Sequence, residues 1–148
     1  MKPHENGDDM DKGTIKDYVQ HRLRVAEENL EDAKFLHEKG RYRAANNRAY
    51  YAIFHAICTV HALDGKGYKS HKQAIGNFNL NYIRTGIFPS EFGHQIAKAQ
   101  EKRHSSDYDY GFVPTEQETK RQVEFADSFI QAVKTFCLDR SDNTDDET

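Results

Sequence analysis

The chain has no tryptophan, only three prolines and two cysteines, and no apolar run near the roughly 20 residues that a membrane-spanning helix needs. Cys58 and Cys137 form no CxxC pair, which excludes a disulfide-rich framework and favours buried free thiols in a reducing compartment. The first residues are polar and lack the apolar segment of a signal peptide. We therefore expect a cytoplasmic protein without membrane contact.

Several common sites are also missing. Eight histidines invite a metal hypothesis, but no HxxxH or HExxH pair places two of them on one helical face. The loop DGKGYK lacks the length and the GK[ST] ending of a P-loop, and no GxSxG element occurs. We expect neither a metal site nor a cofactor.

The charge balance is uneven along the chain. The formal net charge is −3, yet the acidic residues cluster at both ends. Residues 14–140 keep 19 of the 21 basic and 16 of the 24 acidic residues, a charge of about +3. This mild excess permits contact with phosphates without the strongly basic character of a dedicated nucleic-acid-binding domain.

The most informative stretch runs from Arg41 to Leu63 between two glycines, without an internal Gly or Pro, and predicts one helix. Apolar residues cover most of its circumference, so we expect a central helix packed on several sides. One remaining strip carries Arg48, Tyr51 and His55 on a single face. A burial-prone arginine needs a partner, so this strip is either a structural ion pair or a polar site in a groove between helices.

The rest of the chain also has helical periodicity, and no stretch alternates as a strand. We expect a flexible acidic leader over 1–13, one domain over 14–139 and a disordered acidic tail over 140–148. The domain is expected to be an all-α, up-and-down bundle of four to five helices. The predicted helices cover residues 14–39, 41–63, 71–84, 90–103 and 115–139. A loop is predicted over 103–114, and Thr115 with Glu118 forms a capping box.

Three segments together resemble a known family. ANNRAYYAIFHA lies in the central helix, SHKQAIGNF opens the third helix, and EKRHSSDYDY ends the fourth. In this order they resemble HEPN domains, most closely the small stand-alone prokaryotic branch often found beside minimal nucleotidyltransferases. The resemblance covers about residues 15–138 and implies a helical bundle that usually dimerises.

Many HEPN proteins are metal-independent ribonucleases with an arginine, four to six residues and then a histidine. The matching arginine is Arg103, followed by His104. Tyr108 stands where the form R-x4-H-x-Y has its histidine, and Tyr110 stands at the tyrosine position. A phenol titrates near pH 10 and is a poor general base at neutral pH, although it donates hydrogen bonds to phosphate. Arg103 can still bind a phosphate through bidentate hydrogen bonds.

Further residues complete the candidate site. Arg48, Tyr51 and His55 are expected to face Arg103 and Asp107 across the bundle; the alternative is that Arg48 pairs with Asp107 or another acid to fix the fold. His71 and Lys72 follow Ser70 at a helix N-terminus, where backbone N–H groups favour phosphate. The alternative for this segment is a helix cap followed by two solvated residues.

Three functional hypotheses follow. The first is a non-catalytic module that binds a nucleotide, RNA or a partner nucleotidyltransferase, within a toxin–antitoxin or defence-like system. The second is a ribonuclease toxin in which another residue replaces the motif histidine, and the third is a structural dimeric bundle. The resemblance also implies a homodimer and adenylylation of Tyr110 by the partner enzyme. The alternative for Tyr108 and Tyr110 is that both pack over the end of the bundle.

Overall fold

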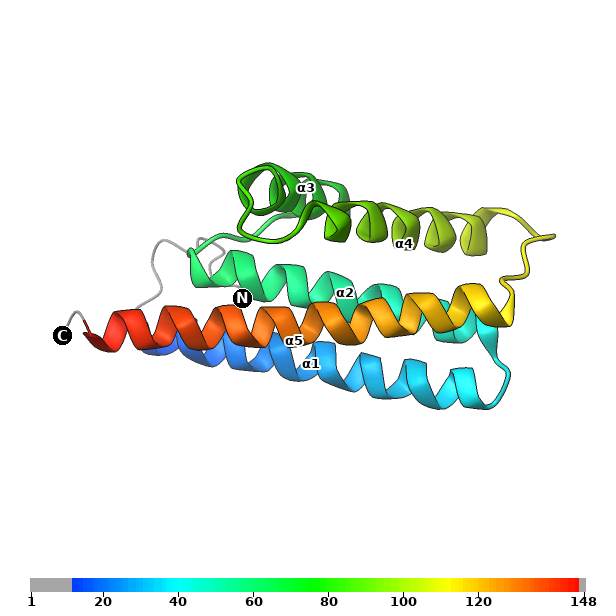
Figure 1. The fold of residues 1–148 in the computed structure, drawn as a ribbon, viewed down its shortest axis with the longest axis horizontal. Coiled ribbons are helices and arrows are strands. Elements are labelled where there is room, and N and C mark those ends of the chain that lie inside the picture. Colours follow the sequence, from blue (N-terminus) through cyan, green and yellow to red (C-terminus); the bar gives the residue numbers. More distant parts are fainter. Residues whose placement is uncertain (1–11, 147–148) are drawn as a thin grey trace.

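The computed structural model describes residues 12–146, and within this range it contains helices and no strand (Figure 1). The helices are α1 (Lys12–Glu38), α2 (Tyr42–Leu63), α3 (His71–Phe78), the π-helical turn η2 (Asn79–Ile83), α4 (Ser90–Tyr108) and α5 (Glu116–Asp146). The predicted all-α bundle is confirmed. Residues 1–11 of the predicted leader, and 147–148 of the predicted tail, lie outside the described residues.

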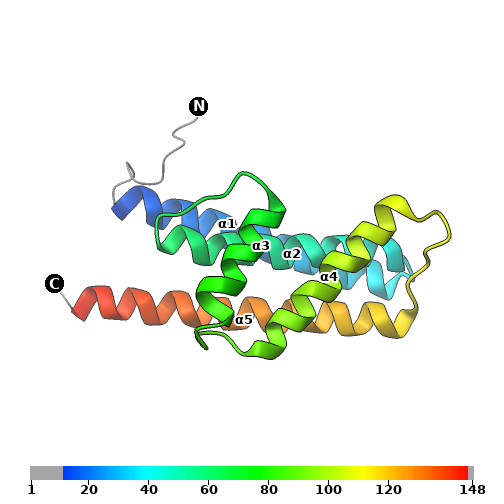
Figure 2. The same cartoon turned by 90° about the horizontal axis from the view of Figure 1, so that it is seen from above.

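The three longest helices, α1, α2 and α5, run side by side along the long axis of the molecule (Figure 1). The remaining helices pack on one face of this layer: α4 runs obliquely over α2, and α3 crosses α2 steeply (Figure 2). α1, α2, α4 and α5 alternate in direction, whereas the short α3 does not follow the up-and-down pattern. α2 contacts each of the other four α-helices, as its apolar circumference predicted.

Small residues let these helices approach α2 closely. Ala45, Ala49, Ala52 and Ala56 are fully buried, at 0% exposure. Ile53, Ile57, Phe78 and Phe129 are the large side chains that fill the space between the helices. Burying each of them stabilises the fold by roughly 1.5–3 kcal/mol relative to an exposed position.

The turn between α1 and α2 is set by a glycine. Gly40 has a φ of 76°, in the left-handed region that side chains with a Cβ avoid. Its N–H donates to the carbonyl of His37 at 3.0 Å, and the N–H of Arg41 donates to that of Leu36 at 2.9 Å. These two bonds close the end of α1 and reverse the chain, so α1 and α2 form the predicted antiparallel hairpin.

Some predicted boundaries were wrong. α1 begins at Lys12, two residues before the predicted start at residue 14. The predicted helix 71–84 is divided, because its second half widens into the π-helical turn η2.

α5 continues past its expected end near Asp139, so the tail that was predicted to be disordered is helical through Asp146. Arg140 explains part of this extension. It forms an ion pair with Asp64 at the end of α2, and its guanidinium lies 5.2 Å from the ring centre of Phe136.

Candidate functional site

The end of α4 carries the residues of the motif and is helical, not a loop as predicted. The helix ends at Tyr108, so Arg103 and Asp107 are one turn apart on the same face. Nη1 of Arg103 lies 2.8 Å from Oδ2 of Asp107, and the two side chains are 31% and 41% exposed. An exposed pair at this spacing stabilises a helix by only about 0.3–0.5 kcal/mol, so a stronger anion can compete with Asp107 for the guanidinium.

A second set of contacts holds Arg103 against α2. Its Nε and Nη2 donate to the Tyr51 hydroxyl at 3.2 and 2.6 Å. The guanidinium also lies 5.2 and 5.4 Å from the ring centres of Tyr51 and Tyr50. The hydrogen bond to Tyr51 raises the pKa of Arg103, so the side chain is a fixed cation. The prediction that Tyr51 faces Arg103 is confirmed.

His71, the first residue of α3, joins the same group. Its Nδ1 lies 2.9 Å from the Tyr50 hydroxyl, and its ring stacks on Phe54 with centres 3.9 Å apart. Burial, and then the charges of Arg103 and Arg22, lower the pKa of His71, so the imidazole is neutral at pH 7. We call Arg103, Tyr50, Tyr51, Phe54 and His71 the Arg103 cluster.

The hydroxyl of Tyr50 fixes the tautomer of His71. Burial raises the pKa of Tyr50 to about 12, so the phenol keeps its proton. The hydroxyl is part-buried and, in the part of the chain that the structure describes, its hydrogen-bond partner is Nδ1 of His71. A buried O–H needs an acceptor, so Tyr50 donates to Nδ1 and the ring proton lies on Nε2. The Arg103 cluster therefore offers a guanidinium and an imidazole N–H, both donors that suit a phosphate oxygen.

His55 lies one turn beyond Tyr51 on α2 but contacts α1, not Arg103 as predicted. Its Nδ1 is 2.6 Å from Nη1 of Arg22. Arginine has no acceptor, so Nδ1 must be unprotonated. Burial, and then the charge of Arg22, lower the pKa of His55 to about 4.

Arg48 is outside the cluster. Its side chain is exposed, and Nη1 donates to Oδ1 of Asn29 on α1 at 3.1 Å. The alternative that it pairs with Asp107 is wrong, because Asp107 pairs with Arg103. Lys72 is exposed on the first turn of α3, in agreement with its interpretation as a solvated residue.

The two other motif positions point outward. His104 is exposed and packs its ring against Tyr108, with centres 4.7 Å apart. Tyr108 and Tyr110 are 76% and 104% exposed, so the alternative that they pack over the end of the bundle is wrong. Tyr108 therefore does not complete a catalytic pair with Arg103 in this conformation.

The loop that carries Tyr110 is anchored at both ends. Arg43 of α2 donates to the carbonyls of Ser106, at 2.9 Å, and Phe112, and its guanidinium lies 6.0 Å from the Phe112 ring centre. On the far side, Thr115 and Glu118 form the predicted capping box, with N–H···O distances of 2.9 and 3.0 Å. Tyr110 lies in the short loop between these two anchors and is exposed to solvent.

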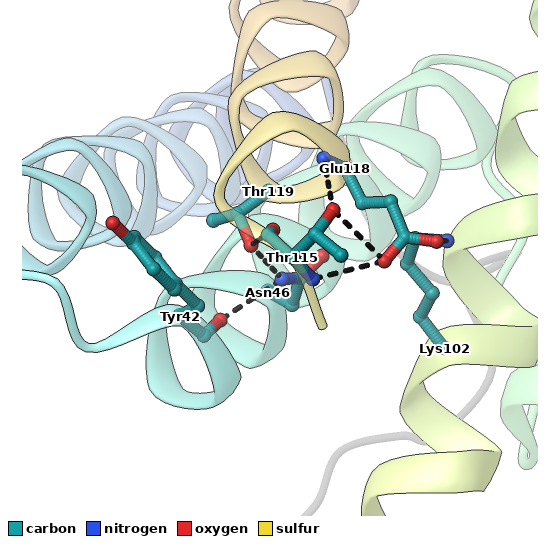
Figure 3. Close-up of polar contacts among 6 residues, drawn as sticks. All are labelled: Tyr42, Asn46, Lys102, Thr115, Glu118 and Thr119. Carbon is teal, nitrogen blue, oxygen red and sulfur yellow. Dashed lines mark hydrogen bonds and ion pairs between the residues drawn. The ribbon is translucent and has the colours of Figure 1, made fainter. Parts of the chain in front are cut away.

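Figure 3 shows the polar contacts around Thr115 and Glu118, which include the buried side chains of Asn46 and Thr119. Nδ2 of Asn46 donates to the Thr119 hydroxyl at 2.7 Å and to the Tyr42 carbonyl at 2.9 Å. Lys102 of α4 lies 3.7 Å from Glu118 of α5. The start of α5 is thereby tied to both α2 and α4.

Within the Arg103 cluster, Tyr50 and Phe54 are buried, whereas Arg103, Tyr51 and His71 are partly exposed. A groove of about 830 Å³ lies elsewhere, between the start of α1 and the end of α5, and none of the candidate residues lines it. Among residues 12–146, no group of three His, Cys, Asp or Glu side chains is arranged to hold a metal ion. No helix of the described chain combines the length and hydrophobicity of a bilayer span. Both cysteines are free, but they are only partly buried.

Three side chains of this surface were missed from the sequence. Tyr50 and Phe54 were assigned only to the apolar surface of α2, and Arg22 was one of several charged residues on α1. The spacing of Tyr50, Tyr51 and Phe54 around one face of α2 was a usable signal for the first two. Arg22 carried no such signal, because its approach to His55 depends on the rotation of α1 against α2.

Comparison with known proteins agrees with this architecture. Residues 19–136 match the model of the HEPN domain. "Putative toxin MJ0605" of Methanocaldococcus jannaschii is 34% identical over 120 residues, which cover 81% of this chain and 89% of that protein. A UPF0332 protein of Thermotoga maritima is 28% identical over 121 residues, covering 82% and 92%. The crystal structure of TT1696 from Thermus thermophilus has the same fold, with a TM-score of 0.66 at 16% identity, over 79% of this chain and 96% of that one.

Proposed function

Because the chain belongs to the HEPN family, we propose that it is a toxin-like HEPN module that binds single-stranded RNA through a phosphate at the Arg103 cluster. It would act in the cytoplasm, within a toxin–antitoxin or defence-like system. A nucleotide in place of RNA is one outcome of the experiment below.

One observation carries this proposal. Tyr51 holds the guanidinium of Arg103 in place, and the neutral His71 lies in the same cluster with its Nδ1 occupied by Tyr50. A fixed cation and an N–H donor on an open surface suit a phosphate that belongs to a long ligand. The partly exposed ring of Tyr51, which lies beside the guanidinium, suits contact with an unpaired base or ribose.

The second candidate function is a ribonuclease, and the position of His71 favours it. His71 places an imidazole from α3 near Arg103, although Tyr108 replaces the histidine of the motif. A general base needs an unprotonated nitrogen, however, and the hydrogen bond from Tyr50 leaves the proton on Nε2. Because Nε2 of His71 carries the proton, the site is better suited to binding RNA than to cleaving it.

Fluorescein-labelled single-stranded RNA, titrated with the purified full chain at several salt concentrations, tests the proposal. We expect saturable binding that weakens at least tenfold in Arg103→Gln, because a charge-assisted contact with phosphate is lost. Arg121→Gln on the exposed face of α5 is the matched control and should bind normally. Binding of a mononucleotide as tight as that of RNA would favour the nucleotide ligand.

The same RNA, incubated with and without chelator, separates the alternatives. Chelator-resistant cleavage that disappears in Arg103→Ala would overturn a purely binding function and establish the ribonuclease. Absence of both binding and cleavage would leave the structural dimeric bundle.

The proposed partners follow from the family. We expect a homodimer, and a minimal nucleotidyltransferase that recognises the loop around Tyr110. The exposure of Tyr110 supports the second expectation, because a modifying enzyme must reach the phenolic oxygen.

A further inference from the structure

Arg22 is a cation beside this surface that neither the motif nor the family resemblance indicates. It is half-buried on α1, where its Nε donates to the Tyr18 hydroxyl at 3.0 Å and its Nη1 donates to Nδ1 of His55 at 2.6 Å. These contacts hold the guanidinium against the face of α2 that also carries the Arg103 cluster.

The charge of Arg22 is not compensated by its neighbours. Tyr18 is a neutral acceptor, and His55 must be neutral because its Nδ1 accepts from a group that can only donate. Among the described residues, no carboxylate lies within ion-pair distance of Arg22, whereas Arg103 has Asp107. A half-buried guanidinium with neutral partners and N–H groups to spare is a site for an external anion.

Arg22 of α1 and Arg103 of α4 both contact α2. Arg103 is held by Tyr51 and Arg22 by His55, and these two anchors are four residues apart on one face of the helix. His71 lies between the two anchors: its ring stacks on Phe54 with centres 3.9 Å apart, and the Phe54 ring lies 5.8 Å from that of His55. The Cβ atoms of Tyr51 and His55 are therefore about one helical turn apart, roughly 5–6 Å.

We infer that Arg22 and His55 form a second phosphate subsite, so that the surface binds two consecutive phosphates of single-stranded RNA, one at Arg103 and the next at Arg22. The inference rests on the proposed function and specifies its ligand. A mononucleotide occupies only one of the two subsites, and a longer strand occupies both.

Short ligands that differ by one phosphate test this directly. UpU has one phosphate and UpUpU has two, and both compete with fluorescein-labelled U12 for the full chain. We expect UpUpU to compete about tenfold better than UpU with the wild-type protein, and this gain to disappear in Arg22→Gln. With U12, the slope of log affinity against log salt should decrease by about 0.7 in the same variant, which corresponds to one phosphate contact.

A matched control and a second measurement distinguish the loss of the second subsite from misfolding of the Arg22→Gln variant. Arg24→Gln removes an exposed arginine two residues away on α1 and should change neither result. In the wild-type protein, the imidazole NMR signals of His55 should shift at saturating UpUpU, and unchanged signals would overturn the inference. This measurement remains decisive if Arg22→Gln does not fold.

The second subsite and the proposed function are overturned by different outcomes. If Arg103→Gln weakens U12 binding while Arg22→Gln leaves affinity and salt slope unchanged, the second subsite is wrong and the proposed function stands. If U12 does not bind the wild-type protein at all, the proposed function itself is wrong. Equal gain from UpU to UpUpU in the wild type and in Arg22→Gln also overturns the inference.

Discussion

The hydroxyl of Tyr50 and Nδ1 of His71 are 2.9 Å apart, which joins α2 to α3 beside the guanidinium of Arg103. This contact decides which nitrogen of His71 carries the proton. It thereby decides whether the imidazole meets a ligand as a donor or as a base.

Tyr50→Phe removes the donor to Nδ1 and should raise the pKa of His71 towards its ordinary value, since protonation no longer displaces a hydrogen bond. An NMR titration of the imidazole signals measures this change. The loss of one part-buried hydrogen bond should also lower the free energy of unfolding by about 1 kcal/mol. An unchanged titration curve for His71 would contradict the assigned tautomer, and Tyr42→Phe serves as a control on the same helix.

Asp107→Asn tests whether Asp107 competes with the ligand for Arg103. The 2.8 Å ion pair neutralises Arg103 in the free protein, and a phosphate bound there would lie close to the carboxylate. Removing the negative charge should therefore tighten RNA binding several-fold at low salt, with little effect on stability because the pair is exposed. Weaker binding would mean that Asp107 contacts the ligand itself.

Stability should depend on pH through His55. Its pKa is lowered to about 4 in the folded chain against about 6.5 in an unfolded chain, so the unfolded state binds the proton first as the pH falls. The contribution of neutral His55 is complete above about pH 6.5 and is lost progressively down to about pH 4. We expect a loss of about 1–3 kcal/mol, with the lower end reflecting solvent screening of a half-buried group.

Urea denaturation at pH 7, 5.5 and 4 measures this loss, and His55→Gln isolates it. Glutamine can still accept from Arg22 but does not titrate, so the variant should show a flatter pH dependence. The pKa values of His61 and His71 are also lowered, mainly by burial, and their contributions persist in the variant. Identical pH profiles for the two proteins would contradict the role of His55.

The fold could be predicted from the sequence because it depends on the periodicity of apolar residues and on the residues that begin and end the helices. The apolar circumference of α2, the left-handed Gly40 and the Thr115 capping box each act locally, and each is visible as a pattern. The end of α4 was harder, because Asp, Ser and Tyr over 103–108 have weak helix propensity and tertiary contacts to Tyr51 and Arg43 keep them helical.

The site was predicted only in part, for geometric reasons. Tyr51 and His71 were expected near phosphate and do lie in the Arg103 cluster. Arg48 and His55 share a face of α2 with Tyr51, yet both contact α1. Arg48 donates to Asn29, and His55 accepts from Arg22. A helical wheel gives the face of a side chain but not the neighbouring helix that it meets.

The homodimer is a prediction for sedimentation at micromolar concentration. A single 17.1 kDa species would contradict it. Reducing agent should leave the mass of the dimer unchanged, because burial raises the pKa of Cys58 and raises that of Cys137 to about 11, so neither thiol forms a reactive thiolate at neutral pH. A mass that falls on reduction would instead indicate an intermolecular disulfide.

Tyr110 is the predicted site of adenylylation by a partner nucleotidyltransferase. It is fully exposed between two anchored ends of its loop, so another enzyme can reach the phenolic oxygen without unfolding the bundle. The phenol oxygen would attack the α-phosphorus of ATP, pyrophosphate would leave, and the phenolic proton would pass to solvent or to a base of the partner enzyme. The product places a phosphodiester charge near Asp107 and Asp109, which should loosen the loop and weaken phosphate binding at Arg103.

Co-expression with the cognate nucleotidyltransferase, followed by intact-mass analysis, tests this modification. We expect one increment of the mass of AMP in the wild-type chain and none in Tyr110→Phe, while Tyr108→Phe, which alters the neighbouring exposed tyrosine, should still be modified. The modified chain should bind labelled RNA several-fold more weakly at low salt than the unmodified chain, and the difference should shrink as salt screens the added charge. An increment that persists in Tyr110→Phe would assign the modification to another residue, and its absence from the wild-type chain would show that the exposed tyrosine is not a substrate of that enzyme.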